Sequence, residues 1–175
     1  MKNNKIIKIV YASLFAALIC VVTMFPQIPV PATGGYIHMG DAVLLIAAWL
    51  LGPIYGTLAA GIGSALADLF SGYVIYAPAT FIIKAVVAVL ATLIFRGCAK
   101  TIKSNIFRYI ISAVLAELFM VLGYFLYELM IYGGGAVAAI PANCIQGGFA
   151  AVAGVLIIRL LITNKTVKEF ILNQR

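Results

Sequence analysis

The sequence contains little charge, and negative charge is the scarcer sign. Only 10% of its 175 residues are charged, with five acidic residues against twelve basic ones. A soluble domain carries about 25% charged residues. Because 65% of the chain is hydrophobic, too few polar side chains remain to cover a surface in water. We therefore expect one integral membrane domain over residues 1–175.

Cysteine and histidine are also scarce. Cys20, Cys98 and Cys144 lie far apart in or beside apolar runs, and His38 is the only histidine. This spacing matches no metal site, and the chain has no Walker A motif. The segment 61–64, Gly-Ile-Gly-Ser, superficially resembles a protease serine motif, but His38 belongs to another span and no other histidine could act as the base. We expect no metal, no cofactor and no enzymatic activity.

The basic residues fall in three clusters, which predict the topology. They precede the first apolar run, separate the fourth run from the fifth, and close the chain: Lys2, Lys5, Lys8; Arg96, Lys100, Lys103, Arg108; Arg159, Lys165, Lys168, Arg175. The positive-inside rule places both termini in the cytoplasm and the connections after the first, third and fifth runs outside. Few aromatic residues are interleaved, so we expect no nucleic-acid binding. Lys84, the remaining basic residue, lies well inside an apolar run.

The apolar runs predict an all-α bundle of six transmembrane helices in the lipid bilayer. They cover about residues 6–25, 39–51, 54–70, 77–95, 106–132 and 137–162. The second run is shorter than the about 20 residues that cross a bilayer upright, so it is tilted or buried among other helices. Gly52-Pro53 is expected to turn the chain into the third run. Residues 26–38 form a long extended outer loop with three prolines, a length typical of lids and binding segments.

Polar side chains recur at one depth, in the outer half of the predicted bundle. Glu117 is the exception, because it lies near mid-depth. Buried charges usually face the interior of a membrane protein. We expect a pocket that opens outward under the first loop, where aromatic rings stack on a flat ligand and polar groups contact its edges. The candidate substrate-binding residues are Tyr36, His38, Asp41, Asp68, Tyr76, Lys84, Tyr124, Glu128, Asn143 and Gln146.

Eight of the ten candidates also have a structural interpretation. Asp68 and Lys84 can neutralise each other between the third and fourth runs, and Asp41 can cap the second helix. Asn143 and Gln146, three residues apart on one helix face, can hydrogen-bond to neighbouring helices. His38, Tyr76 and Glu128 can instead be ordinary residues at the ends of helices, where they face the membrane interface or water and contact no ligand.

Short local motifs indicate which class of membrane protein this chain resembles. The first run contains Ala12-x-x-x-Ala16, and the segments 34–41 (GGYIHMGD), 61–68 (GIGSALAD) and 76–80 (YAPAT) follow, the last shortly before Lys84. Together with six short spans and a proline-containing first loop, these segments resemble the substrate-binding S-components of energy-coupling factor (ECF) vitamin transporters. The resemblance covers essentially the whole chain.

The resemblance implies a mechanism and a set of partners. Ala12 and Ala16 would dock on an ECF transmembrane coupling subunit, which two cytoplasmic ATPases drive. The S-component would capture a vitamin outside a prokaryotic cell membrane, topple as it docks, and release the ligand inside. The expected ligand is a small flat heteroaromatic vitamin or precursor: pyridoxine-like, hydroxymethylpyrimidine-like or riboflavin-like.

A proton-coupled secondary transporter is the alternative. Intramembrane carboxylates often carry protons, and Asp68 and Glu117 are the candidates. A secondary transporter would move its substrate without a partner and would respond to a proton gradient. An S-component would bind its ligand alone but need ATPase partners for sustained uptake.

Overall fold

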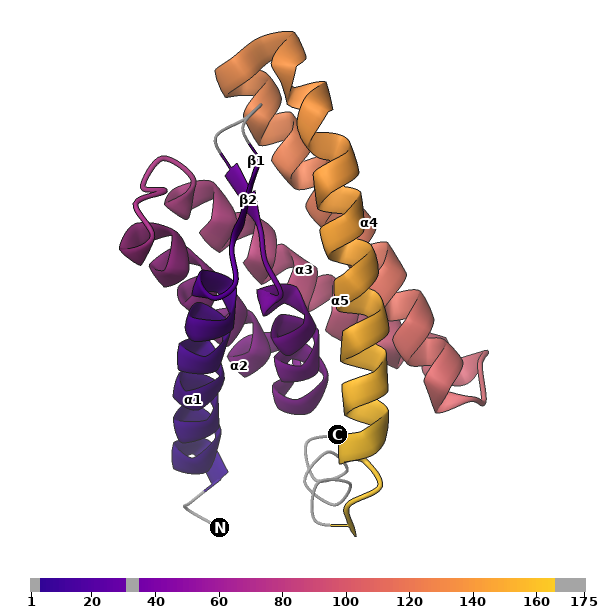
Figure 1. Cartoon of the computed structure of the whole chain (residues 1–175). Helices are drawn as coiled ribbons and strands as arrows, with labels where there is room; N and C mark the ends of the chain where they lie inside the picture. Colours follow the sequence, from indigo (N-terminus) through magenta and orange to yellow (C-terminus); the bar gives the residue numbers. More distant parts are fainter. Residues whose placement is uncertain (1–3, 31–34, 166–175) are drawn as a thin grey trace.

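The computed structural model describes residues 4–30 and 35–165, and helices dominate this part of the chain (Figure 1). The elements are α1 (Asn4–Met24), β1 (Ile28–Val30), β2 (Gly35–Ile37), α2 (Gly40–Phe70), α3 (Ala77–Gly97), η1 (Cys98–Lys100), α4 (Asn105–Tyr132), η2 (Gly133–Ala139) and α5 (Ile140–Leu161). Helix α2 contacts α1, α3 and α5, and α4 contacts α3 and α5. Helix α2 is therefore the element around which the others pack.

Four helical stretches of the described chain are long and apolar enough to cross a membrane. They are Lys5–Met24, Gly40–Phe70, Ala77–Lys100 and Asn105–Leu161. Large apolar side chains such as Leu14, Ile82, Val152 and Leu160 point outward, where a soluble protein would carry charge. The predicted all-helical membrane architecture is confirmed at this level.

Helix α2 is broken at Gly52. This residue has φ 79° and ψ −174°, a conformation that only glycine adopts without strain. Pro53 follows, at the first turn of the continuing helix, where proline is tolerated. A Cβ atom on Gly56 would lie 2.8 Å from the Cα of Ala48, eight residues earlier. In a straight helix those residues are about 12 Å apart along the axis, so the chain folds back into a first arm (residues 40–51) and a second arm (residues 53–70).

The first arm of α2 forms the core of the molecule. All its residues except Val43 are buried, and Leu44, Leu45, Ala47 and Ala48 have at most trace exposure. The sequence left open whether this short apolar run is tilted in lipid or buried among helices. It is buried, because α1, α3 and α5 all pack against α2.

The loop between α1 and α2, which the sequence predicts to be extended, contains a short antiparallel hairpin. Ile28 pairs with Ile37, Pro29 with Tyr36, and Val30 with Gly35. Two strands of three residues give no detectable alternation of polar and apolar side chains. The hairpin adds a small β element to the expected all-α fold.

The last long helix begins later than the sequence predicts. The sequence predicted a helix from residue 137, but residues 133–139 form the 3₁₀ helix η2, and α5 begins at Ile140 with Pro141 in its first turn. Proline at this position favours the start of a helix.

The two ends of the bundle differ in their elements. The beginning of α1 and the end of α5 lie at the lower end in Figure 1, and the hairpin and η2 lie at the upper end. The broken point of α2 and the link from α3 to α4 also lie in the lower half. The polar residues discussed below gather beneath the hairpin.

Candidate functional site

A cavity lies beneath the hairpin, between β2, the end of α2, α3, α4 and α5. We call it the hairpin cavity. Its volume is about 40 Å³, room for a few water molecules and far below the about 300–1,000 Å³ of a typical ligand pocket. Its lining residues are Val30, Gly35, Tyr36, His38, Asp68, Tyr76, Thr80, Tyr124, Glu128, Ala139, Ala142, Asn143 and Gln146. In this structure the cavity is therefore too small for a ligand of that size.

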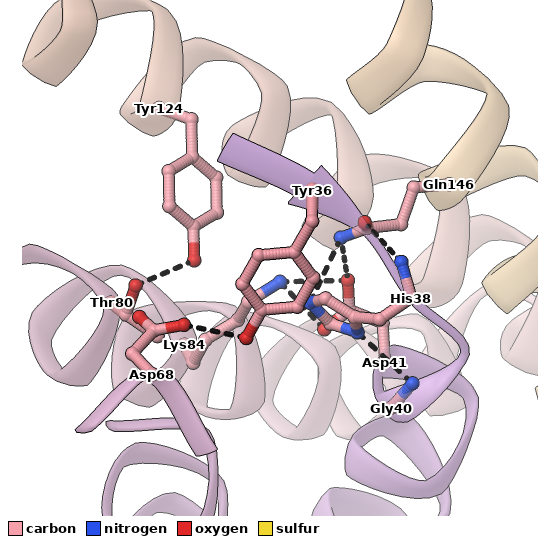
Figure 2. Close-up of polar contacts among 9 residues, drawn as sticks. All are labelled: Tyr36, His38, Gly40, Asp41, Asp68, Thr80, Lys84, Tyr124 and Gln146. Atoms are coloured by element: carbon pink, nitrogen blue, oxygen red, sulfur yellow. Dashed lines mark hydrogen bonds and ion pairs between the residues drawn. The ribbon is translucent and has the colours of Figure 1, made fainter. Parts of the chain in front are cut away.

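Tyr36 ties the hairpin to α2 across this cavity (Figure 2). Its hydroxyl donates a 2.7 Å hydrogen bond to Oδ1 of Asp68, and its ring centroid lies 4.4 Å from that of Tyr73. Burial, together with the negative charge of Asp68, raises the pKa of Tyr36 above its ordinary value. The side chain therefore stays a neutral phenol that donates its proton to the carboxylate.

Asp41 and Lys84 form an ion pair behind the cavity. Nζ of Lys84 lies 2.7 Å from each carboxylate oxygen of Asp41, and both side chains are fully buried. The amide nitrogen of Gln146 donates a third hydrogen bond to Asp41 Oδ2 at 2.7 Å. Three charge-assisted bonds offset much of the desolvation that burying these groups costs.

This pairing corrects two of the structural interpretations. Lys84 forms its ion pair with Asp41, and not with Asp68, because the side chain points toward the start of α2. Asp41 does not cap α2: its carboxylate turns away to Lys84 and Gln146, and no side chain bonds at the N-cap, Met39. Neither Asp41 nor Lys84 lines the cavity.

His38 joins the hairpin to α5 and α2. Its backbone N–H donates to Oε1 of Gln146 at 3.0 Å, and its ring Nδ1 accepts the backbone N–H of Gly40 at 3.1 Å. Burial lowers the pKa of His38 to about 4. The ring is therefore neutral at physiological pH, which agrees with the acceptor role of Nδ1.

The far wall of the cavity comes from α3 and α4. The hydroxyls of Thr80 and Tyr124 are 3.0 Å apart, and the hydroxyl of Tyr76 donates to Oε1 of Glu128 at 3.3 Å. Nζ of Lys84 lies 5.1 Å from the ring centroid of Tyr124, within range of a cation–π contact. Tyr124 thus lies between the buried ion pair and the cavity.

Eight of the ten candidate residues line the hairpin cavity, and Asp41 and Lys84 support it from behind. Asn143 is half-buried and faces the cavity from α5. Thr80 lines the cavity but was not among the candidates. Its position four residues after Tyr76 and four before Lys84 places all three on one helix face, which was the available signal. Ala139 and Ala142 were missed because nothing in their apolar side chains marks them.

Ala12 and Ala16 lie on a separate apolar surface, the α1–α2 groove. Its volume is about 400 Å³, and it is lined by Ile9, Ala12, Ser13, Ala16 and Ala17 of α1 and by Tyr55, Leu58, Ala59, Ile62 and Leu66 of α2. Part of the surface of α1 that carries Ala12 and Ala16 packs against α2, since a Cβ on Gly63 would lie 2.5 Å from the carbonyl oxygen of Ala16. Ala12 is buried and Ala16 half-buried.

Glu117 lies outside the hairpin cavity, in a crevice between α4 and α5 with a volume of about 180 Å³. Its side chain is 4% exposed, and neither carboxylate oxygen accepts a hydrogen bond from a described residue. Gly147 faces it closely, because a Cβ there would lie 3.1 Å from the Cβ of Glu117. The other lining residues are apolar or cysteine, except for the two glycines of α5.

Comparison with known proteins places this geometry in a family. The family model for the S component of ECF-type riboflavin transporters matches residues 3–163. The protein belongs to this family. It is an S-component, a membrane subunit that serves vitamin uptake by binding the substrate and working with an ECF module. The family is one of transporter components and not of enzymes.

Two individual proteins resemble this S-component over most of its length. A protein of Pyrococcus woesei, described as "Uncharacterized protein in gap 3'region", is 38% identical over 140 residues, which are 79% of this chain and 88% of the relative. A solved structure described as "Structure and mechanism of the S component of a bacterial ECF transporter" has a TM-score of 0.69 and 25% identity. The match covers 93% of this chain and 98% of that one.

Proposed function

We propose that this S-component captures a small flat heteroaromatic vitamin or precursor in the hairpin cavity, on the outer side of a prokaryotic cell membrane. The candidate classes are pyridoxine-like, hydroxymethylpyrimidine-like and riboflavin-like compounds. The observation that carries the proposal is the convergence of Tyr36, Tyr76 and Tyr124 with polar side chains from five elements on one cavity. Aromatic rings provide stacking area, and the hydroxyl, amide and carboxylate groups provide directional hydrogen bonds.

The proposed topology has six membrane crossings. Helix α2 supplies two, because it folds back at Gly52, and the stretch Asn105–Leu161 supplies two more through α4 and α5. With α1 and α3, this gives an even number of crossings, which agrees with α1 starting and α5 ending at one end of the bundle (Figure 1). The basic clusters assign that end to the cytoplasm.

Ligand entry requires the hairpin to move. The cavity is much smaller than any candidate ligand, and the hydrogen bond from Tyr36 to Asp68 ties the hairpin to α2 across it. The remaining ties of the hairpin to the helices include the bond from His38 to Gln146. A few bonds of about 1 kcal/mol each are within reach of the binding energy of a vitamin.

Delivery is proposed to occur by toppling on an ECF transmembrane subunit with two cytoplasmic ATPases, with Ala12 and Ala16 in the docking surface. The α1–α2 groove supports this role, because its small residues allow another helix to approach closely. The exposed Ala17 and Ser13 extend the same surface.

The test of capture is to purify the chain from its expressing cells and identify co-purified small molecules by mass spectrometry. A bound vitamin of the proposed classes, or a rise in thermal stability when one is added, supports capture. The absence of both would contradict it.

For docking, Ala16→Trp is expected to abolish uptake in cells while ligand binding by the purified chain survives. Lost binding with intact subunit association would refute the docking role.

One observation favours the alternative of a proton-coupled secondary transporter, namely the buried carboxyl group of Glu117, to which no described residue donates a hydrogen bond. Reconstitution separates the two functions. A secondary transporter would accumulate substrate in vesicles that contain this chain alone under a proton gradient, whereas an S-component would need the ECF module and ATP. Glu117→Gln would abolish transport in the first case only.

A further inference from the structure

The charges that line the hairpin cavity are of one sign. Asp68 and Glu128 both contribute carboxylates, and their side chains are 4% and 3% exposed. None of the described residues that line the cavity is Lys or Arg. The sequence of the four undescribed residues between the strands, 31–34, contains no Lys or Arg either. No positive side chain of the cavity lining is therefore available to an anionic ligand.

The nearest cation is already neutralised. Lys84 directs its ammonium group to both oxygens of Asp41 at 2.7 Å, behind the ring of Tyr124. To bind a ligand carboxylate, Lys84 would have to give up a fully buried ion pair and leave Asp41 without its counter-charge. His38 offers no positive charge, because its Nδ1 accepts a hydrogen bond from the backbone of Gly40.

Asp68 has an unused acceptor at the cavity. Its Oδ1 accepts the hydroxyl of Tyr36 (Figure 2). Its Oδ2 is buried and no described donor meets hydrogen-bond geometry with it, although the Thr80 hydroxyl interacts with this carboxyl group from α3. A buried acceptor without a donor is costly, and a ligand that supplies an N–H group removes that cost. When the hairpin moves and Tyr36 withdraws, Oδ1 becomes a second acceptor for the same ligand.

We propose that the hairpin cavity selects by charge: its ligand is neutral or positively charged, donates an N–H group to Asp68, and carries no carboxylate or phosphate. This inference rests on the proposed function of vitamin capture and adds the chemical class of the ligand. It predicts that the site takes an amine or a ring N–H and excludes the phosphorylated or carboxylated form of the same compound.

The experiment compares ligands that share one ring and differ in charge. Pyridoxamine, pyridoxine and 4-pyridoxic acid carry an aminomethyl, hydroxymethyl and carboxylate group at the same position. Riboflavin and riboflavin 5′-phosphate form a second matched comparison. Calorimetry on the purified full chain is expected to give at least about ten-fold tighter binding for the cationic and neutral forms, equivalent to about 1.4 kcal/mol. Equal or tighter binding of the anionic forms would overturn the charge inference alone.

Variants test whether Asp68 is responsible for the preference for cationic and neutral ligands. Asp68→Asn is expected to lose most of the preference for pyridoxamine over 4-pyridoxic acid. Tyr36→Phe, which removes the bond to Asp68 and keeps the carboxylate, is expected to retain that preference, and it replaces Asp68→Asn if the latter does not fold. Glu117→Gln is the control, because it neutralises a buried carboxyl outside the cavity. Discrimination that survives in Asp68→Asn, or is lost in Tyr36→Phe, contradicts the role of Asp68. If no compound of any class binds the wild-type chain, vitamin capture itself fails.

Discussion

The ammonium group of Lys84 lies 2.7 Å from both carboxylate oxygens of Asp41, and neither side chain is exposed. This pair joins α3 to the start of the first arm of α2, directly behind the aromatic wall of the hairpin cavity. It therefore links the stability of the bundle to the shape of the proposed site.

Removing one member of this pair is expected to be strongly destabilising. Lys84→Met leaves Asp41 buried without a counter-charge, and breaking a buried pair costs about 3–5 kcal/mol. The double variant Asp41→Asn with Lys84→Met removes both charges and is expected to recover part of the loss. Thermal unfolding in detergent compares the stability of Lys84→Met, Asp41→Asn and the double variant. A double variant that is as unstable as the sum of the single variants would show that the two side chains do not interact.

The stability of the folded chain is expected to fall as the pH drops from about 6.5 to about 4 because of His38. In this window the histidine of the unfolded chain binds a proton and the buried one does not, so protons favour unfolding. The full contribution, at most about 3 kcal/mol, is present above pH 6.5 and is lost progressively toward pH 4. Denaturant unfolding at several pH values measures it. His38→Asn should flatten this part of the profile, and an unchanged profile would assign it to other groups.

Glu117 is expected to be dispensable for stability. Its carboxylate oxygens accept no hydrogen bond from the described residues, so Glu117→Gln removes an ionisable group and breaks no bond seen in the structure. We expect the free energy of unfolding to be no more than about 0.5 kcal/mol below that of the wild type, and it can be higher. A loss of 2 kcal/mol or more, about the cost of an unsatisfied buried group, would reveal a partner for this carboxyl.

The fold-back of α2 is expected to depend on Gly56. A methyl group there would lie 2.8 Å from the Cα of Ala48 and 2.9 Å from the carbonyl oxygen of Ala47. Both are backbone atoms, so Gly56→Ala forces the two arms apart at a cost of about 1–3 kcal/mol. Gly97→Ala is the matched control, because nothing lies within 4 Å of the added methyl group. Equal thermal stability of the two variants would contradict the close approach of the arms.

That Asp41, Asp68 and Lys84 lie close together could be predicted from the sequence, but their pairing could not. Counting residues from the ends of the apolar runs placed Asp41, Asp68 and Lys84 near one level. Which carboxylate pairs with Lys84 depends on how α2 and α3 rotate about their axes, and the sequence of a nearly uniform apolar helix does not determine that rotation. The sequence interpretation paired Lys84 with Asp68, and the structure pairs it with Asp41 instead.

The hairpin shows a second limit of prediction from the sequence, because its strand pairing could not be predicted. Prolines 26, 29 and 31 correctly indicated that the first helix ends and an extended segment follows. The pairing of Pro29 with Tyr36 depends instead on contacts between the hairpin and the helices, such as the bond from Tyr36 to Asp68. Such long-range contacts leave no periodic signal in two strands of three residues.

Binding affinity in two neighbouring variants of α5 tests the central claim most directly. Asn143 lines the hairpin cavity, whereas Cys144 is exposed and lines the crevice between α4 and α5. With the vitamin that co-purifies with the wild-type chain, calorimetry is expected to show at least about ten-fold weaker binding for Asn143→Leu and unchanged binding for Cys144→Leu. Wild-type affinity in Asn143→Leu would contradict a ligand site in the hairpin cavity.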